Sequence, residues 1–415
     1  MQRRDLLKFL GSLPAARIGQ CATAGLALGS TRLYAAPQTN ARLLVVFMRG
    51  AYDASNLLVP IGSDFYYESR KTIAIPRPQG SGKSKADGKA VALPLDADWG
   101  LHPIMKDTLL PLYKEKQLAF VNFAGTDDLT RSHFDTQNTI ELGQALKGQR
   151  DYGSGFLNRL VEVMGRNKAH PCAFSGQLPL IMRGKADVPN IALAAPKMAK
   201  PLKERQQKLI QRMYKDSTLG DMVREGFTVR NASADAIKKE MDEASGGAIS
   251  AAGFKGEARR VATLMRDRFN VGFVDVGGWD THVNQGGVEG ALAKRLDILA
   301  QGLKGFAEGM GDQWKNTVVV VVSEFGRTFR ENGNRGTDHG HGTTYWVMGG
   351  SVKGGQIAGE QTELTAKTLN QNRDYPVLNN YRDVLGGLFQ RMYGLNAKQV
   401  QTVFPGAKAK DVGLV

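Results

Sequence analysis

Short apolar runs recur along the chain and are separated by longer stretches of mixed polarity. Each run ends at a Gly, a polar residue or a charged residue, which is typical of a strand buried on both faces. Four such strands are predicted, at 43–48, 118–123, 271–276 and 317–322, and the last contains five consecutive valines. Strands of this kind usually belong to parallel sheets.

The longer stretches between these runs have helical periodicity. They predict helices at about 134–147, 156–166, 201–242, 256–269 and 288–308. Strands that alternate with helices are typical of α/β folds. We therefore expect a three-layer α/β/α sandwich with a mostly parallel central sheet. It would form a single domain over residues 37–415, with a helical insertion at about 183–255.

The first 36 residues have the pattern of an export signal. Arg3 and Arg4 precede a weakly apolar stretch that is rich in Gly and Ala and ends at Ala35–Ala36. This pattern resembles a twin-arginine signal with a cleavage site at its end. Arg17 and Arg32 interrupt the apolar stretch, so no transmembrane span is expected. We expect a periplasmic or otherwise exported protein whose partner during export is the twin-arginine translocase.

Composition narrows the range of functions. The formal net charge is +15, and the first 36 residues hold five basic residues against one acidic, which leaves +11 for the rest. The chain has no long Lys and Arg run with interleaved aromatics, so nucleic-acid binding is not expected. The surplus is compatible with anionic small molecules or envelope material as substrate. Two cysteines, Cys21 and Cys172, are too few for a disulfide framework or a cysteine-rich metal site.

Four of the six histidines lie near predicted strand ends: His133, His282, His339 and His341. The carboxyl ends of strands are where open α/β sheets bind ligands. Asp280 and His282 are two residues apart, and so are His339 and His341, so in an extended segment each pair points to one side. Imidazole combined with carboxylate suits Zn²⁺, Mn²⁺ or Fe. The alternative for any single histidine is an ordinary hydrogen bond within a loop.

The segment around Ser132 has the features of a helix start. Ser132 precedes Asp135 by three residues, which resembles a capping box, so Ser132 is a natural N-cap. A helix start also attracts anions, and a cap does not require the neighbouring Arg131 and His133. The segment therefore has two interpretations, a simple cap or part of a site. His102, beside a proline, predicts a turn instead.

Together these motifs resemble the family catalogued as domain of unknown function 1501. The resemblance rests on Phe47–Gly50 with Asp53, Arg131–Asp135, Gly278–His282, Ser323–Thr328 and Asp338–Gly342. The family is placed in the alkaline phosphatase-like superfamily, alongside sulfatases and cofactor-independent phosphoglycerate mutases. The resemblance thus implies an alkaline phosphatase-like fold over nearly the whole mature chain. Members of the family are usually exported by the twin-arginine pathway, so the resemblance implies the same export for this chain.

The resemblance also implies roles for individual residues. One or two divalent ions, Zn²⁺ or Mn²⁺, would be held by a set of acids and histidines: Asp53, Asp280, His282, Glu324, His339 and His341. Ser132 would be the nucleophile and His133 a proton shuttle. Arg327 would pair with the anionic oxygens of the substrate, with Arg49 and Arg131 as alternatives.

The implied function is an exported metal-dependent hydrolase of phosphate or sulfate esters. One departure from the superfamily pattern matters, because Glu324–Phe325 stands where an Asp-His pair is usual. The second metal site then lacks an imidazole unless His133 or His339 supplies it. The alternative function is an exported binding or assembly protein that retains the fold without the chemistry.

Overall fold

The structure is a computed structural model that describes residues 40–78, 85–86, 89–192, 204–214, 217, 219–223 and 254–415. The expected signal at 1–36 lies outside these residues, as does most of the expected insertion at 183–255. Among the described helices, none combines the length and the hydrophobicity that a membrane span requires.

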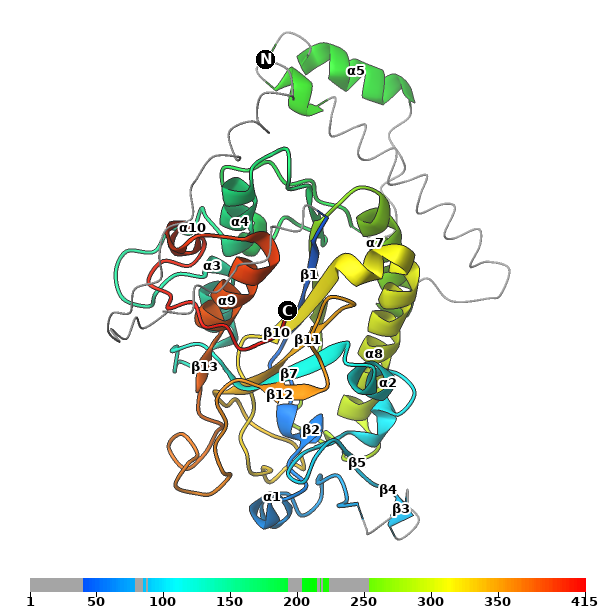
Figure 1. The fold of residues 1–415 in the computed structure, drawn as a ribbon, viewed down its shortest axis with the longest axis vertical. Coiled ribbons are helices and arrows are strands. Elements are labelled where there is room, and N and C mark those ends of the chain that lie inside the picture. Colours follow the sequence, from blue (N-terminus) through cyan, green and yellow to red (C-terminus); the bar gives the residue numbers. More distant parts are fainter. Residues whose placement is uncertain are drawn as a thin grey trace, which may run out of the picture. The chain divides into compact units, whose positions relative to one another are not determined.

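A mostly parallel sheet lies at the centre of the fold (Figure 1). Its strand order is β12-β7-β11-β10-β1-β9-β8, and β13 also pairs with β7. The strands are β1 (Arg42–Arg49), β7 (Leu118–Gly125), β8 (Pro171–Phe174), β9 (Val271–Gly277), β10 (Thr317–Ser323), β11 (Thr343–Met348), β12 (Gln356–Ala358) and β13 (Asn379–Asn380). All four predicted strands are confirmed. Only β11 runs antiparallel to its neighbours, β10 and β7, within this described sheet.

The central strands are apolar throughout because both of their faces are covered. On β1, Leu44 and Val46 belong to one core cluster, whereas Leu43 and Val45 belong to the other. Successive side chains of a strand point to opposite faces, so a strand without a polar face needs packing partners on both sides.

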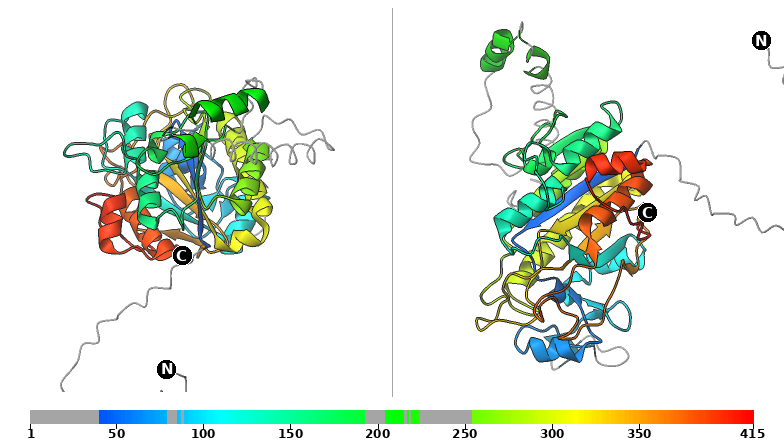
Figure 2. Two further views of the ribbon diagram at one scale, coloured as in Figure 1. Left: turned by 90° about the horizontal axis from the view of Figure 1, so that it is seen from above. Right: turned by 90° about the vertical axis from the view of Figure 1, so that its left-hand side faces the viewer.

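Helices supply those partners on both faces of the sheet (Figures 1 and 2). One face packs against α2 (Leu109–Lys114), α7 (Phe254–Asp267) and α8 (Ala291–Met310). The other packs against α3 (His133–Leu142), α4 (Phe156–Met164), α9 (Tyr381–Tyr393) and α10 (Ala397–Val403). The expected mixed α/β fold with a mostly parallel sheet is confirmed.

Smaller elements complete the described chain. They are η1 (Ala54–Asn56), β2 (Leu58–Val59), α1 (Asp64–Ser69), β3 (Lys85–Ala86), β4 (Lys89–Ala90), β5 (Leu93–Pro94), β6 (Gly100–Leu101), η2 (Pro103–Met105), η3 (Leu180–Met182), α5 (Glu204–Tyr214) and η4 (Gly311–Asn316). Four predicted helices correspond to α3, α4, α7 and α8. The first of them ends at Leu142 rather than near 147, because Gly143 adopts the left-handed conformation with φ 62°. Of the predicted 201–242 helix, α5 is the main part that the structure describes.

The sheet brings distant loops to one edge. Met48 of β1 lies in register with both Val276 of β9 and Ser323 of β10, and all three strands are parallel. The residues that follow these strands therefore emerge side by side. Because β11 is antiparallel to β10, the residues that precede β11 reach the same edge from outside the sheet.

His102 is fully buried and begins the short helix η2. Its Nδ1 accepts a hydrogen bond from the Ile104 amide at 3.1 Å, and its Nε2 lies 3.1 Å from the Gly287 carbonyl oxygen. The predicted turn role is confirmed. Burial lowers the pKa of His102 to about 4, so the ring stays neutral in the folded protein at physiological pH.

We expect this histidine to make stability depend on pH. The unfolded chain takes up a proton near the ordinary histidine pKa of about 6.5, whereas the folded chain resists it down to about pH 4. Stability should therefore fall with acidification across that window, by up to about 3 kcal/mol. Replacing His102→Asn keeps a capping acceptor without the titrating ring, so urea denaturation should show a smaller loss of stability on acidification. His170→Gln, at an exposed histidine, should retain the wild-type loss. Equal losses in both variants would contradict the assignment.

Candidate metal centre

Three histidine rings meet at the carboxyl edge of the sheet. His133 begins α3, His282 follows β9, and His339 precedes β11. The Nε2 atom of His339 lies 3.0 Å from Nε2 of His133 and 3.0 Å from Nε2 of His282. Elements that are distant in the sequence thus bring the same atom of each ring to one point.

Asp280 adds a carboxylate to this point. Its Oδ1 lies 2.9 Å from Nε2 of His282 and 3.4 Å from Nε2 of His339, and its Oδ2 lies 3.6 Å from Nε2 of His133. One ligand atom from each of His133, Asp280 and His339 falls within a common span of 4.8 Å. Three imidazoles and one carboxylate therefore form a four-residue cluster, which we call the His₃Asp cluster.

The opposite nitrogen of each ring has its own hydrogen-bond acceptor. His133 Nδ1 lies 2.7 Å from Glu324 Oε1, His282 Nδ1 lies 3.1 Å from Asp338 Oδ1, and His339 Nδ1 lies 2.9 Å from the carbonyl oxygen of Arg131. A carboxylate or a carbonyl oxygen only accepts, so each neutral ring donates from Nδ1. In that tautomer the Nε2 atom of each ring carries the lone pair that a metal ion would accept. This is the hydrogen-bonding pattern of metal-ligating histidines.

The resulting arrangement suits a cation. Three lone pairs and an anionic oxygen that face one another repel unless a positive charge lies between them. A tetrahedral ion with bonds of about 2.0 Å to nitrogen and oxygen would separate neighbouring ligand atoms by about 3.3 Å. The separations of the other two rings from His339 Nε2, and of the three rings from the nearer Asp280 oxygen, run from 2.9 to 3.6 Å. The cluster could therefore hold Zn²⁺ or a similar ion.

The His₃Asp cluster is open to solvent on one side. The side chains of Asp280 and His282 are 43% and 40% exposed, whereas that of His133 is 21% exposed. A structural zinc site is normally closed by its ligands, while a catalytic site stays accessible. The exposure of these ligands favours a site that a small molecule can reach.

Arg327 lies beneath the cluster with its side chain fully buried. One Nη2 group donates to Asp280 Oδ1, while its buried Nε and Nη1 groups have no hydrogen-bond partner. Burial raises the pKa of Asp280, but the charge and hydrogen bond of Arg327 outweigh burial, so that pKa is lower than usual. Asp280 therefore stays ionised and available as a ligand. Arg327 is thus in contact with the cluster through Asp280.

Glu324 lies behind the cluster and orients His133. Its Oε1 accepts hydrogen bonds from His133 Nδ1, the Gly50 amide at 2.8 Å and Gln137 Nε2 at 2.9 Å, and its Oε2 accepts from Ser323 Oγ at 3.0 Å. Burial raises the pKa of Glu324, and these donors reverse the shift so that the pKa lies below its usual value. The structure therefore places Glu324 on the far side of a ligand ring rather than among the ligand atoms.

Asp53 is held in a separate buried network. Both of its oxygens accept hydrogen bonds from the Arg70 guanidinium, and Oδ2 also accepts from Gln285 Nε2 at 2.6 Å. A fully buried Arg70 compensates the charge of this carboxylate. The structure does not bring Asp53 into the His₃Asp cluster.

His341 and Ser132 also lie outside the cluster. His341 is buried near Asp128, and burial together with the charge of Arg131 lowers its pKa to about 4. Ser132 is the N-cap of α3, where its Oγ accepts from the Asp135 amide at 3.4 Å. The capping interpretation of Ser132 is confirmed, and Ser132 directly precedes the ligand His133.

Close backbone contacts explain the glycines around His339. A Cβ on Gly340 would lie 2.4 Å from the Arg327 backbone, and one on Gly336 would lie 2.3 Å from the His282 carbonyl oxygen. Arg327 and His339 also form an antiparallel bridge. The glycines thus let the segment before β11 pack against the loop that carries His282 and the loop that carries Arg327. Sequence reasoning did not find the roles of Asp338 and the Arg131 carbonyl, because no local pattern marks a partner of Nδ1.

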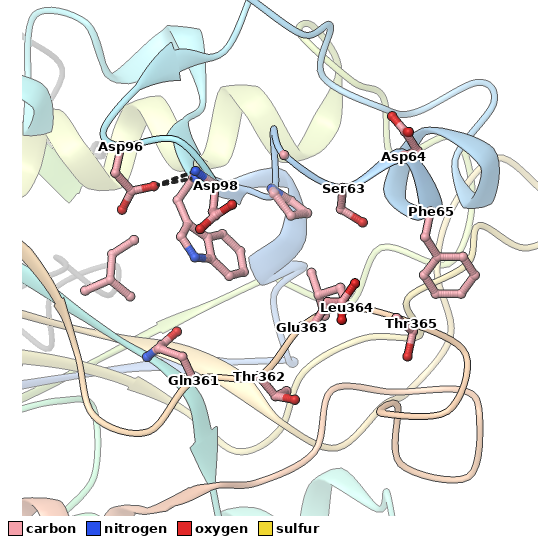
Figure 3. A pocket seen from close by; sticks show the side chains of 14 residues that line it. Ser63, Asp64, Phe65, Asp96, Asp98, Gln361, Thr362, Glu363, Leu364 and Thr365 are labelled. Atoms are coloured by element: carbon pink, nitrogen blue, oxygen red, sulfur yellow. Dashed lines mark hydrogen bonds between the residues drawn. The ribbon is translucent and has the colours of Figure 1, made fainter.

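A cavity of about 800 Å³ lies elsewhere in the described structure (Figure 3). Its lining includes Asp64 and Phe65 of α1, Asp98, and Glu363, and none of the four His₃Asp residues. The ring of Phe65 stacks on Phe329 at 5.0 Å, two residues beyond Arg327.

The fold and the cluster together define a mixed α/β protein with a candidate metal centre at its sheet edge. The model of the family described as protein of unknown function (DUF1501) matches residues 40–404. That span covers most of the chain, so the protein belongs to this family, as its motifs predict. A search among curated proteins finds no match.

Proposed function

We propose that the protein is a metal-dependent hydrolase of phosphate or sulfate esters, with an alkaline phosphatase-like fold. The observation that carries the proposal is the convergence of three histidine Nε2 atoms and the Asp280 carboxylate at an accessible sheet edge. Histidine nitrogen combined with carboxylate oxygen favours Zn²⁺ or Mn²⁺ over Mg²⁺ or Ca²⁺. A bound ion would supply a Lewis acid and would lower the pKa of a bound water to about 7.

One ion is the number that these residues favour. The carboxylates expected at a second site are Asp53 and Glu324, and both already accept hydrogen bonds on both oxygens. Releasing Asp53 would leave the buried Arg70 without its counter-charge, which is costly in a protein interior. We therefore propose a mononuclear centre held by His133, Asp280, His282 and His339.

The protein residues have separate tasks in this proposal. The ligands hold the ion, while Glu324, Asp338 and the Arg131 carbonyl keep the ligand rings in one tautomer. Arg327 keeps Asp280 ionised and brings a positive charge to the site, which favours an anionic ester. Ser132 is the proposed nucleophile, because it precedes His133 at the positive end of α3.

The second candidate is an exported binding or assembly protein without turnover. The observation that favours it is Glu324–Phe325, since Phe325 stacks on His133 at 4.9 Å between ring centroids where a further ligand would otherwise stand. In this candidate function the ion would stabilise the loops around it and would take no part in a reaction. Metal content would be equal in the two cases, so turnover separates them.

We also propose that the chain is exported through the twin-arginine pathway to the periplasm or its equivalent. The support is Arg3 and Arg4 ahead of the Ala35–Ala36 end, and the surplus of basic residues in this segment. Replacing both arginines by lysine should leave the protein in the cytoplasm with its amino terminus intact. Immunoblotting of cell fractions would show where the variant is located. Normal export of the variant would contradict the proposal.

The metal centre predicts the ion content of the purified protein. Elemental analysis of native protein should give about one Zn or Mn per chain. His339→Ala removes the ring that contacts both other histidines, so it should abolish retention of the ion. His170→Ala, at an exposed histidine outside the cluster, should retain one ion. Native protein without ions, or equal retention by both variants, would count against the centre.

The hydrolase predicts turnover that depends on Ser132. Wild-type protein should hydrolyse aryl phosphates or aryl sulfates, and a chelator should abolish this activity. Ser132→Ala should lower kcat by about a thousandfold or more, as expected when a covalent nucleophile is lost, with the ion retained. The exposed Ser217→Ala serves as a control. Wild-type inactivity across both ester classes, with one ion bound, would favour the binding or assembly function.

A further inference from the structure

The backbone of Arg131 adopts a conformation that favours glycine. Its φ is +54°, in the left-handed region, where a side chain costs about 1 kcal/mol or more. Arg131 immediately precedes the N-cap of α3, and its carbonyl oxygen accepts the hydrogen bond from His339 Nδ1 at 2.9 Å. The unfavourable conformation thus coincides with the group that orients a ligand of the His₃Asp cluster.

The Arg131 side chain is fixed at several points. Its Nε and Nη2 both donate to Asp374 Oδ2, at 2.9 and 2.6 Å, and Nη2 also donates to Gln371 Oε1 at 2.8 Å. The Asp374 side chain is fully buried. Two donors on the same Asp374 oxygen, with a third contact to Gln371, restrain the direction of the guanidinium more than a single hydrogen bond would.

Asp374 is itself tied to the segment that carries Arg327. Its backbone bridges both Thr328 and Asn370, and the Phe329 amide donates to the Arg373 carbonyl oxygen at 2.9 Å. The turn at 370–374 therefore has a fixed position relative to the loop after β10. Through the contact with Asp374, the Arg131 side chain is held at a fixed position relative to that loop.

We propose that Asp374 is a positioning residue for the metal centre, acting through Arg131 on the ring of His339. The inference rests on the proposed function, because it assumes that the His₃Asp cluster holds an ion. The ion pair keeps Arg131 in its left-handed conformation, and this conformation directs the carbonyl oxygen at His339 Nδ1. Without this ion pair the Arg131 carbonyl turns away from His339. His339 then loses the acceptor that keeps its proton on Nδ1, and its Nε2 is no longer held ready as a metal ligand.

The experiment compares ion binding by full-length variants. Asp374→Asn preserves the size of the side chain and removes the charge that holds Arg131. Its dissociation constant for Zn²⁺ should rise about 10- to 100-fold, the usual effect of losing a partner behind a ligand. With Co²⁺ as the probe, its visible absorption band should also change, because the orientation of one ligand ring changes. A general loss of stability would not alter the spectrum of the molecules that remain folded.

Two further variants complete the test. Asp411→Asn removes a comparable carboxylate that pairs with Arg391 at 3.5 Å, and it should bind both ions as the wild type does. Arg131→Lys retains the charge without the two-point contact, so it should show a smaller increase in the dissociation constant, and it decides the matter if Asp374→Asn does not fold. Wild-type affinity and an unchanged Co²⁺ spectrum in the folded variants would overturn this inference and leave the proposed metal centre unaffected. A wild type that binds neither ion would overturn the proposed centre with it.

Discussion

Three imidazole rings at one edge of the sheet bring their Nε2 atoms together, and the Nδ1 atom of each ring faces an acceptor on its far side. The acceptors responsible are a buried carboxylate, a half-exposed carboxylate and a main-chain carbonyl, from Glu324, Asp338 and Arg131. Because these acceptors face away from the cluster, they determine what the cluster can bind. The glycine contacts, the left-handed Arg131 and the four hydrogen bonds of Glu324 all serve to hold these acceptors in place.

Most charged side chains at this edge form pairs of opposite charge. Asp53 is matched by Arg70, and Arg49 contacts both Glu141 and Asp275. Arg327 is the exception, because only one of its buried nitrogens has a partner, and that partner is Asp280. The edge thus carries many acids, yet most are engaged by a basic side chain of the protein. Asp280 differs from them because it is also exposed and lies against three ring nitrogens.

Four strands of the central sheet, β1, β7, β9 and β10, could be predicted from the sequence because their apolar runs need cover on both faces, and the helical periodicity predicted α3, α4, α7 and α8. The strands β8 and β11 of the same sheet were not predicted. The strand end at 280–282 and the histidine at 339 were predictable because strand ends of an α/β sheet converge. His133 was expected to shuttle protons, and the structure places its Nε2 among the candidate ligand atoms. Glu324 and Asp53 were expected as ligands by resemblance, but their partners Gln137, Gly50, Arg70 and Gln285 come from distant segments. Local spacing does not reveal which donors reach a buried carboxylate.

The antiparallel β11 has a consequence for how the protein folds. It brings His339 to a ring that lies 206 positions earlier in the chain and to another that lies 57 positions earlier. Contacts over such separations form late, because a long loop must close before they are made. The His₃Asp cluster therefore exists only in chains whose sheet is already assembled across β1, β9, β10 and β11. An ion that binds there acts on the native state and not on partly folded chains, and so shifts the folding equilibrium by mass action toward the completed sheet.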